Sequence, residues 1–210
     1  PTADVEGYDA CRKIAILTSL AYGQHVDYED IYTEGITAIT DVDFKYASKM
    51  GRVIKLFGKS KRVGDKFFAM VAPFMIDDND PLYSVNGVLN GILVKGNVLG
   101  DVMFYGSGAG KLPTASAVVA DVVDMARHQH TNIYIDWKPE KLTLVSYDDS
   151  VNRFFVRTDS PKEEVEKIFG NVSYVENVVD GEYGFTTEAM AEKDFAAKAD
   201  KINVINRIRL

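Results

Sequence analysis

The chain has 210 residues, of which 24 are Lys or Arg and 31 are Asp or Glu, so its formal net charge is −7. At roughly 150 residues per domain, this length allows one large domain or a main domain with a smaller second one. The acidic balance argues against general nucleic-acid binding, which needs a basic surface that releases phosphate counterions. No apolar run approaches the roughly 18 residues of a membrane span, and the N-terminus has no signal-peptide pattern. We therefore expect neither a nucleic-acid partner nor a membrane partner.

Cysteine and histidine are scarce in this chain. Cys11 is the single cysteine, so no internal disulfide can form, and this usage is typical of a reducing compartment such as the cytoplasm. His25 is isolated, and although His128 and His130 are close together, no acidic or cysteine partner falls at metal-ligand spacing. The sequence therefore predicts a cytoplasmic protein without a metal site.

The first half of the chain predicts three helices followed by a sheet. Between Tyr8 and Tyr22, four apolar residues recur at helical spacing, namely Ala10, Ile14, Leu17 and Ala21, and Gly23 follows where a helix commonly ends. Two more helices are expected at about 28–32 and at 41–51, the latter with Asp41 as its N-cap. The expected strands are 53–57, 66–72, 88–95 and 98–105, with a tight turn at 95–97. Because the helices are polar on one side, we expect them to cover the sheet.

A glycine-rich loop follows the last of these strands. Gly106-Ser107-Gly108-Ala109-Gly110 interrupts the strand pattern, and Pro113 and Thr114 begin a helix that extends to Ala126. Bare backbone before a helix N-terminus can approach a phosphate or a substrate. The spacing is GxGxG and not the GxGxxG of dinucleotide sites, so a strand-to-helix turn that needs positive φ angles is the alternative interpretation.

The last third of the chain changes character. From residue 129 to 152 the periodicity fades, which indicates a linker, and the pattern then predicts strand, helix, strand, strand, helix and strand. This βαββαβ order within about 60 residues is typical of a ferredoxin-like module. The expected fold class is therefore α+β, with helices covering a mostly antiparallel or mixed sheet, followed by this module. The predicted domains are 1–130 and 153–210, joined by a linker at 131–152.

Asp4, Asp9 and Lys13 are the residues best placed for chemistry. Asp9 and Lys13 are four residues apart and therefore share one helix face, at the border of the apolar stripe. A lysine beside a carboxylate can act as a general acid or base. A helix ion pair worth under about half a kcal/mol is the alternative, and the spacing alone favours it.

Three segments resemble one enzyme family. The first is Pro1-Thr2-Ala3-Asp4-Val5-Glu6-Gly7-Tyr8-Asp9-Ala10-Cys11-Arg12-Lys13, which closely resembles the homoserine dehydrogenase signature P-x-x-D-[LIVM]-x-G-x-D-x-x-x-K. Tyr32-Thr33-Glu34-Gly35-Ile36 and the strand-loop-helix segment from Asn90 to Val119 are similar to further parts of that family. The resemblance is strong over residues 1–127 and extends to the remainder only by layout, since the family often has a C-terminal ACT domain of ferredoxin-like fold.

The resemblance implies reversible hydride transfer between a nicotinamide cofactor, NAD or NADP, and the C4 carbon that links L-homoserine to L-aspartate 4-semialdehyde. This reaction belongs to threonine, methionine and isoleucine biosynthesis. It implies that Lys13 moves or holds the proton on the hydroxyl oxygen, that Asp9 orients Lys13 and the substrate, and that Asp4 holds the substrate ammonium group. Four residues are implied to contact the cofactor, namely Gly106, Gly108, Gly110 and Thr114.

The family also has an N-terminal Rossmann domain, and no G-x-G-x-x-G strand-helix unit precedes Pro1. We therefore expect this chain to be the catalytic and C-terminal part of the enzyme, inactive without the domain that binds most of the cofactor and sets the choice between NAD and NADP. The family pairs its central sheets, which implies a homodimer.

One turn departs from the family pattern. Regulatory ACT domains usually have Gly in the turn that here reads Asp159-Ser160-Pro161-Lys162-Glu163, and this chain has Lys162 instead. The substitution puts the usual effector, L-threonine, in question and suggests that the module serves mainly in dimer packing. A non-enzymatic amino-acid-sensing or dimerisation module is the alternative function for the whole chain.

Overall fold

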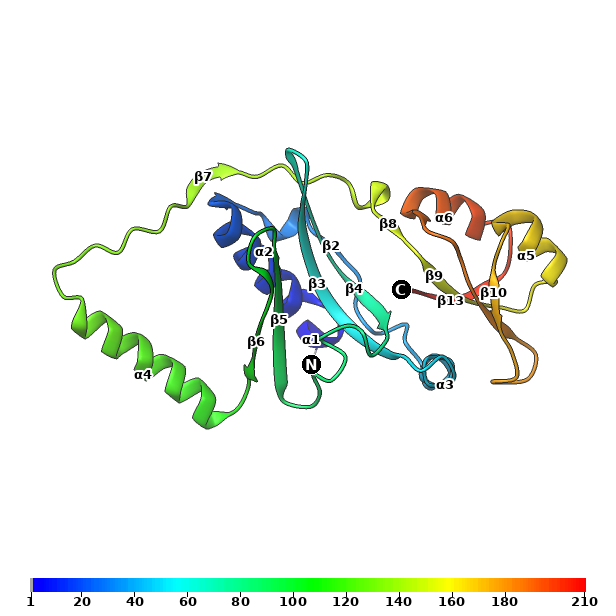
Figure 1. The fold of residues 1–210 in the computed structure, drawn as a ribbon, viewed down its shortest axis with the longest axis horizontal. Coiled ribbons are helices and arrows are strands. Elements are labelled where there is room, and N and C mark those ends of the chain that lie inside the picture. The colour runs from blue at the N-terminus through cyan, green and yellow to red at the C-terminus, as the bar shows by residue number, and fades with distance from the viewer. Residues whose placement is uncertain (1) are drawn as a thin grey trace. The chain divides into compact units, whose positions relative to one another are not determined.

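The computed structural model describes residues 2–210, which form two compact units: residues 2–76 with 136–210, and residues 77–135. Figure 1 shows the helices and strands of both units in chain order. No helix in the described part of the chain is both long enough and apolar enough to cross a membrane.

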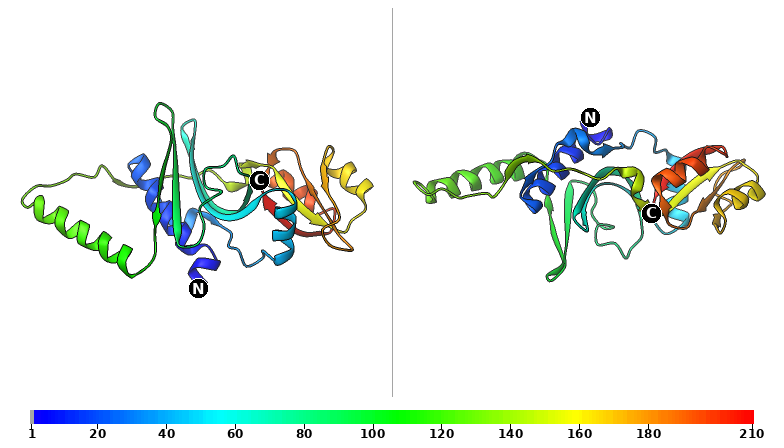
Figure 2. Two further views of the ribbon diagram at one scale, coloured as in Figure 1. Left: turned by 60° about the horizontal axis from the view of Figure 1, so that its bottom comes forward. Right: turned by 90° about the horizontal axis from the view of Figure 1, so that it is seen from above.

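A mixed sheet of seven strands forms the centre of the first unit (Figures 1 and 2). The strand order is β10-β11-β9-β13-β4-β2, and β3 pairs with β4. Because β4 is antiparallel to β3 but parallel to β2 and β13, the predicted mixed α+β fold is confirmed. The strands are β2 (Tyr32–Thr33), β3 (Val53–Val63), β4 (Lys66–Ile76), β9 (Phe154–Thr158), β10 (Ser173–Val175), β11 (Tyr183–Thr186) and β13 (Val204–Arg209). The α-helices of this unit are α1 (Thr2–Val5), α2 (Tyr8–Tyr22), α3 (Asp41–Lys49), α5 (Lys162–Phe169) and α6 (Glu192–Ala199).

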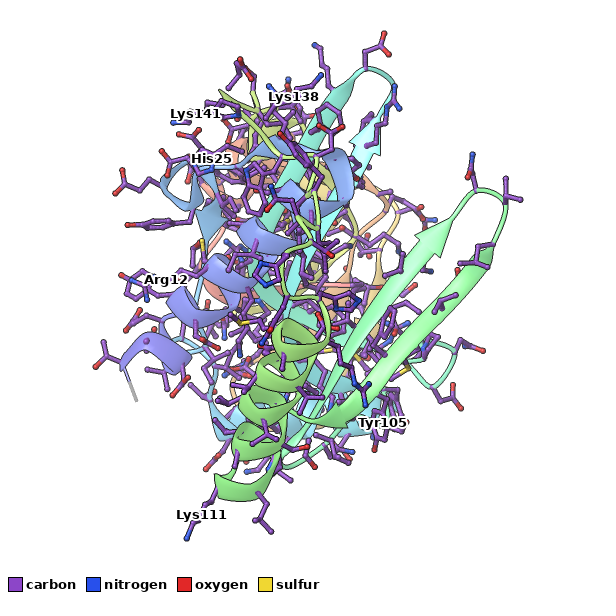
Figure 3. All side chains as sticks on the ribbon, turned by 90° about the vertical axis from the view of Figure 1, so that its left-hand side faces the viewer. Arg12, His25, Tyr105, Lys111, Lys138 and Lys141 are labelled. Atoms are coloured by element: carbon purple, nitrogen blue, oxygen red, sulfur yellow. The ribbon has the colours of Figure 1, made fainter. Side chains whose placement is uncertain are left out.

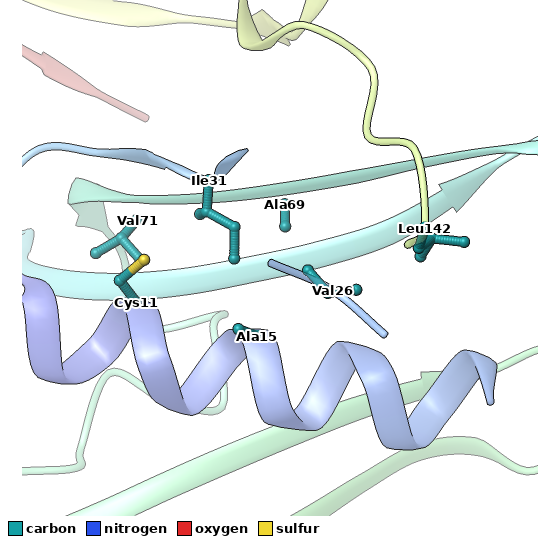
Figure 4. Close-up of a cluster of buried hydrophobic side chains, with 7 residues drawn as sticks. All are labelled: Cys11, Ala15, Val26, Ile31, Ala69, Val71 and Leu142. Carbon is teal, nitrogen blue, oxygen red and sulfur yellow. The ribbon is translucent and has the colours of Figure 1, made fainter. Parts of the chain in front are cut away.

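Helix α2 confirms the helix predicted over 8–22 and packs against β3 and β4. Its buried residues are Cys11, Ala15, Thr18 and Ser19, so the buried face is rotated by about one residue from the predicted apolar stripe. Thr18 and Ser19 can be buried because their hydroxyls donate to the carbonyl oxygens four residues earlier, at 2.6 and 2.8 Å. Figure 4 shows the resulting core between α2 and the sheet, which contains Cys11, Ala15, Val26, Ile31, Ala69, Val71 and Leu142.

The other two helix predictions have different outcomes. The helix predicted at 28–32 is wrong, because only a 3-10 turn, η1 (Tyr28–Asp30), is present there. Helix α3 confirms the third predicted helix, but its N-cap is Thr40 and not Asp41. The Asp43 carboxylate accepts a hydrogen bond from the Thr40 backbone N–H at 2.7 Å, which completes a capping box that Asp41 could not form.

The strands β3 and β4 extend beyond the predicted 53–57 and 66–72. β3 continues through a basic segment because its lysines pair with β4, and the ammonium groups of Lys59 and Lys61 lie 4.3 and 5.3 Å from the ring centroids of Phe74 and Phe68. From residue 68 to 76, every residue of β4 is buried. A strand that is covered on both faces has a continuous apolar run and lacks the alternation on which strand prediction depends.

Apart from the two-residue strand β12 (Met190–Ala191), which pairs outside the module's sheet, residues 154–209 have the predicted βαββαβ order. Their strands lie in the order β13-β9-β11-β10 and are all antiparallel, as in a ferredoxin-like module. The helices α5 and α6 cover one face, where Phe195 stacks on Phe154 at 3.9 Å between ring centroids. Helix α3 covers the other face, where Tyr46 contacts Phe155. The ACT-type assignment of this module remains a prediction.

The segment 131–152, predicted to be a linker, contains regular structure in its second half. Its elements are β7 (Lys138–Lys141), η2 (Tyr147–Asp149) and β8 (Val151–Asn152), and the two strands pair with β1 (Gln24–His25) and β12 (Met190–Ala191), respectively. Figure 3 shows His25, Lys138 and Lys141 close together where β1 meets β7. Leu142 is buried in the core beneath α2. The segment from residue 136 onward therefore belongs to the first compact unit, and the division into domains at 130 and 153 remains a prediction.

The second unit contains a hairpin of β5 (Leu89–Gly96) and β6 (Gly100–Ser107), and the helix α4 (Lys111–Arg127). Among the described strands, β5 and β6 pair only with each other. The turn predicted at 95–97 lies at 97–99, because Gly96 pairs with Gly100, whose φ of +77° favours glycine. Helix α4 begins two residues before Pro113, so Thr114 lies in its first turn.

Candidate active site

Asp4 and Asp9 lie on either side of a glycine turn that joins α1 to α2. Gly7 in this turn has a φ of +80°, which side chains of L-residues rarely adopt. Gly7 is also buried, and a Cβ at this position would lie 3.2 Å from side-chain atoms of both Thr33 and Val71. The glycine is therefore needed both for the turn and for its close approach to the sheet.

The structure brings Asp9 and Lys13 together, as their spacing predicted. Lys13 Nζ lies 2.7 Å from Asp9 Oδ2, and the two side chains are 64% and 47% exposed. The sequence predicted both residues at the border of the apolar stripe of the helix, and their side chains are more exposed than that position implies. Arg12 also projects outward from α2 (Figure 3). Because both side chains are exposed, the pair is accessible to a ligand. It contributes little to folding, since an exposed ion pair adds only about 0–1 kcal/mol to stability.

The segment Glu34-Gly35-Ile36 supports the turn that carries Asp4 and Asp9. The Ile36 backbone N–H donates to the Val5 carbonyl oxygen at 2.7 Å. A Cβ on Gly35 would lie 2.6 Å from Glu6 Cα, so only glycine permits this contact between two backbones. The glycines of the two sequence motifs thus lie at one interface.

Glu34 is fixed by two arginines of the last strand. Its carboxylate accepts from Arg207 Nη1 at 2.8 Å and from Arg209 Nη1 at 2.7 Å. Arg209 is fully buried and also donates to Glu192 Oε1 at 2.6 Å. Burial acts to raise the pKa of the Glu34 carboxyl, but the charges of Arg209 and Arg207 outweigh it and lower this pKa below its ordinary value.

Sequence reasoning missed this ion group. Glu34 belongs to a motif that resembles the family, but only its glycine neighbour gave a local signal. Arg207 and Arg209 are isolated cations at the end of the chain, far from Glu34 in sequence. A buried ion pair between distant segments leaves no periodic pattern, so only the structure reveals it.

The predicted cofactor residues lie in the second unit, whereas Asp4, Asp9 and Lys13 lie in the first. Gly106, Gly108, Gly110 and Thr114 are all exposed. Gly110 alone of these glycines has a positive φ, of +119°. The alternative interpretation, a strand-to-helix turn whose glycines need positive φ angles, therefore holds for Gly110 only. A Cβ on Gly108 would lie 2.6 Å from Asn90 Cγ, so a larger residue there would require the exposed Asn90 side chain to move.

Metal-ligating side chains are dispersed over the described residues. Within residues 2–210, no three or more His, Cys, Asp or Glu side chains are grouped so that they could bind a metal ion. The ring of His128 contacts Asp124 on the same helix at 3.2 Å, an i,i+4 contact on an exposed surface.

The family model described as homoserine dehydrogenase matches residues 1–123, which include the glycine turn, the Asp9–Lys13 pair and the glycine-rich loop. The chain belongs to the homoserine dehydrogenase family. It is 41% identical over 133 residues to the homoserine dehydrogenase of Bacillus subtilis, a match that covers 63% of this chain and 31% of that protein. It is 50% identical over 129 residues to that of Synechocystis sp., over 60% of this chain and 30% of the relative.

A solved homoserine dehydrogenase structure matches the whole chain. The crystal structure from Thiobacillus denitrificans aligns with a TM-score of 0.84 and 31% sequence identity, over 100% of this chain and 54% of that chain. The structural likeness thus extends past the part matched by the family model. The matched part of the chain covers less than a third of the length of the Bacillus and Synechocystis relatives.

Proposed function

We propose that this chain supplies the catalytic part of a homoserine dehydrogenase, which interconverts L-homoserine and L-aspartate 4-semialdehyde with NAD or NADP. The observation that carries the proposal is the exposed ion pair of Lys13 and Asp9, at 2.7 Å, within the segment that the family model matches. A purely structural ion pair would need neither its exposure nor the glycine turn that presents it. The reaction would belong to threonine, methionine and isoleucine biosynthesis.

Lys13 is proposed to move the proton at the substrate oxygen. In the direction of reduction, the aldehyde oxygen gains negative charge as hydride arrives at C4, and the Lys13 ammonium donates a proton to it. In the direction of oxidation, the same proton passes from the hydroxyl to the Lys13 amine. Asp9, whose carboxylate lies 2.7 Å from Lys13 Nζ, fixes the direction of the ammonium group and stabilises its charge.

The two aspartates are proposed to bind the amino-acid end of the substrate. An α-ammonium group requires a carboxylate partner. Asp4 and Asp9 flank one turn, and Gly7 in this turn allows it to pack closely against the sheet. A turn fixed in this way can place two carboxylates with little loss of entropy on binding. Asp4 would hold the ammonium group, while Asp9 would contact both substrate and Lys13.

The glycine-rich loop of the second unit is proposed to contact a nicotinamide dinucleotide. The cofactor, when bound, would supply the hydride in the direction of reduction and accept it in the direction of oxidation. No described side chain caps the N-terminus of α4, so its first backbone N–H groups remain available to an anionic phosphate. Gly106 leaves the adjoining backbone bare, Gly108 and Gly110 add no side chain of their own, and the exposed Thr114 hydroxyl adds a donor in the first turn.

The decisive experiment is reduction of NAD and of NADP by the full-length protein that carries this sequence, in the presence of L-homoserine. We expect reduction that depends on L-homoserine. L-2-aminobutyrate, which has the same ammonium and carboxylate groups but no hydroxyl, should give none. A well-folded protein that reduces neither nucleotide would contradict the proposal and favour the amino-acid-sensing alternative.

The β9–α5 turn supports a packing role for the C-terminal module over binding of L-threonine. Lys162, which stands where regulatory ACT domains usually have glycine, forms an ion pair with Glu176 and lies 4.8 Å from the centroid of the Tyr174 ring. Asn203 donates to Asp159 Oδ1 at 2.8 Å. The polar groups of this turn are thus used within the module, and L-threonine added to the assay is expected to leave the rate unchanged.

A homodimer is proposed to form through the β5–β6 hairpin. Ile92 and Phe104 are directly opposite each other, and with Val94 they leave one face apolar, with exposed fractions of 41%, 63% and 46%, respectively. A two-stranded ribbon is marginally stable by itself, so burial of this face against a second copy would stabilise it. Sedimentation velocity should show a dimer that Phe104→Asp weakens. A wild-type protein that remains monomeric at micromolar concentration would contradict the proposal.

A further inference from the structure

The turn of residues 4–7, called the substrate turn below, is joined by a series of contacts to the C-terminal end of the chain. The turn of residues 4–7 contacts the segment 34–36 through Gly7, Gly35 and the hydrogen bond from Ile36 to Val5. The same segment carries Glu34, whose backbone N–H donates to the Val71 carbonyl oxygen at 2.9 Å and whose side chain binds two arginines. A continuous series of contacts therefore joins strand β13 to the turn.

The ion pairs of Glu34 with Arg207 and Arg209 are largely shielded from solvent, which favours a rigid arrangement. The Glu34 side chain is 24% exposed, Arg207 is 26% exposed, and Arg209 is fully buried. Tyr32 Oη also donates to Glu34 Oε2 at 3.0 Å, so both carboxylate oxygens have charged or polar partners. A carboxylate fixed from several directions loses little further freedom and defines the path of its backbone.

We propose that Glu34 is a positioning residue for the substrate: clamped by Arg207 and Arg209, it holds the segment 34–36 against the turn that places Asp4 and Asp9. This inference rests on the proposed function, because Asp4 and Asp9 are the residues assigned to the substrate ammonium group. It gives the C-terminal module an indirect part in substrate binding, through β13 and Glu34, without any effector.

A second ion group provides a matched control. Arg157 in β9 donates to Asp43 Oδ1 and to Glu182 Oε1, both at 2.8 Å, and thus joins the C-terminal module to α3. Glu182 is 11% exposed and accepts from a single arginine. It resembles Glu34 in residue type and burial, but its partners do not include the segment 34–36. Loss of either glutamate charge should disturb stability, whereas only loss of the Glu34 charge should disturb the substrate turn.

The kinetic test compares Glu34→Gln with Glu182→Gln in the full-length protein. Glu34→Gln is expected to raise the KM for L-homoserine roughly tenfold or more, since small displacements of positioning groups have effects of this size. The KM for the nicotinamide cofactor should stay unchanged. Arg207→Gln should act in the same way from the side of the module, and Arg207→Lys, which keeps the charge, should recover most of the loss. If Glu34→Gln and Glu182→Gln change the KM for L-homoserine equally, the positioning role is excluded.

Hydrogen exchange tests the same coupling without turnover. The amides of Glu6, Gly7 and Ile36 donate to Thr2, Asp4 and Val5 carbonyl oxygens, respectively. Arg207→Gln should speed their exchange, whereas Glu182→Gln should not. Unchanged exchange in Arg207→Gln would overturn the inference even if the wild type turns over L-homoserine. If the wild type shows no turnover, the proposed function fails, and the exchange data still decide whether the Glu34 group holds the turn.

Discussion

Lys13→Ala is expected to lower kcat/KM for L-homoserine by roughly 10²- to 10⁴-fold, the range in which a positioned general acid or base contributes. Its melting temperature should stay close to that of the wild type, because the ion pair with Asp9 is exposed and worth about 0–1 kcal/mol. Steady-state kinetics and thermal unfolding of the same preparation measure both quantities.

Lys193→Ala is a suitable control for that experiment. Lys193 forms an ion pair with Asp149 at 2.6 Å, with side chains 59% and 62% exposed, and therefore resembles Lys13 in its exposure and in having a carboxylate partner. Its variant should keep full activity. If both variants had the same kcat/KM, Lys13 would be one more surface ion pair, and the signature around it would serve only the fold.

The sequence was sufficient to predict the elements whose signals are local. Helix 8–22 ends at a glycine, and the Asp9–Lys13 pair depends only on a spacing of four residues, so both were predictable. The buried face of α2 was not, because Thr18 and Ser19 look polar in sequence but satisfy their hydroxyls on the backbone of the helix itself. Apolar periodicity therefore placed the face about one residue away.

The support of the site depends on contacts between distant segments, which local patterns do not encode. Gly7 and Gly35 each belong to a recognisable motif, yet nothing in either motif indicates that they meet at one interface. The arginines of β13 are more than 170 residues from Glu34, a separation at which neither helical nor strand periodicity carries information. The sequence was enough to propose the reacting residues, and the structure was needed to reveal the contacts that surround them.

Arg209→Met is expected to have the largest effect on stability, a loss of about 3–5 kcal/mol in the free energy of unfolding. The methionine can fill much of the space of the arginine side chain but cannot neutralise Glu192, whose side chain is only 5% exposed. Glu34 would retain Arg207, so the main cost arises from the uncompensated Glu192 carboxylate. Although burial acts to lower the pKa of Arg209, its hydrogen bonds with Glu192 and the charges of Glu34 and Glu192 raise this pKa above the ordinary arginine value.

Urea unfolding, followed by circular dichroism, measures this loss as a shift of the midpoint. Arg62→Met is the matched control, because Arg62 pairs with Asp65 at 3.4 Å on the surface, where the two side chains are 61% and 102% exposed. Its free energy of unfolding should change by less than about 1 kcal/mol. An Arg209→Met variant as stable as Arg62→Met would show that Glu192 finds water or another partner, and that the buried charges do not fasten β13 to the rest of the sheet. A large loss confined to Arg209→Met would instead establish β13 as the strand through which the C-terminal module is joined to the site.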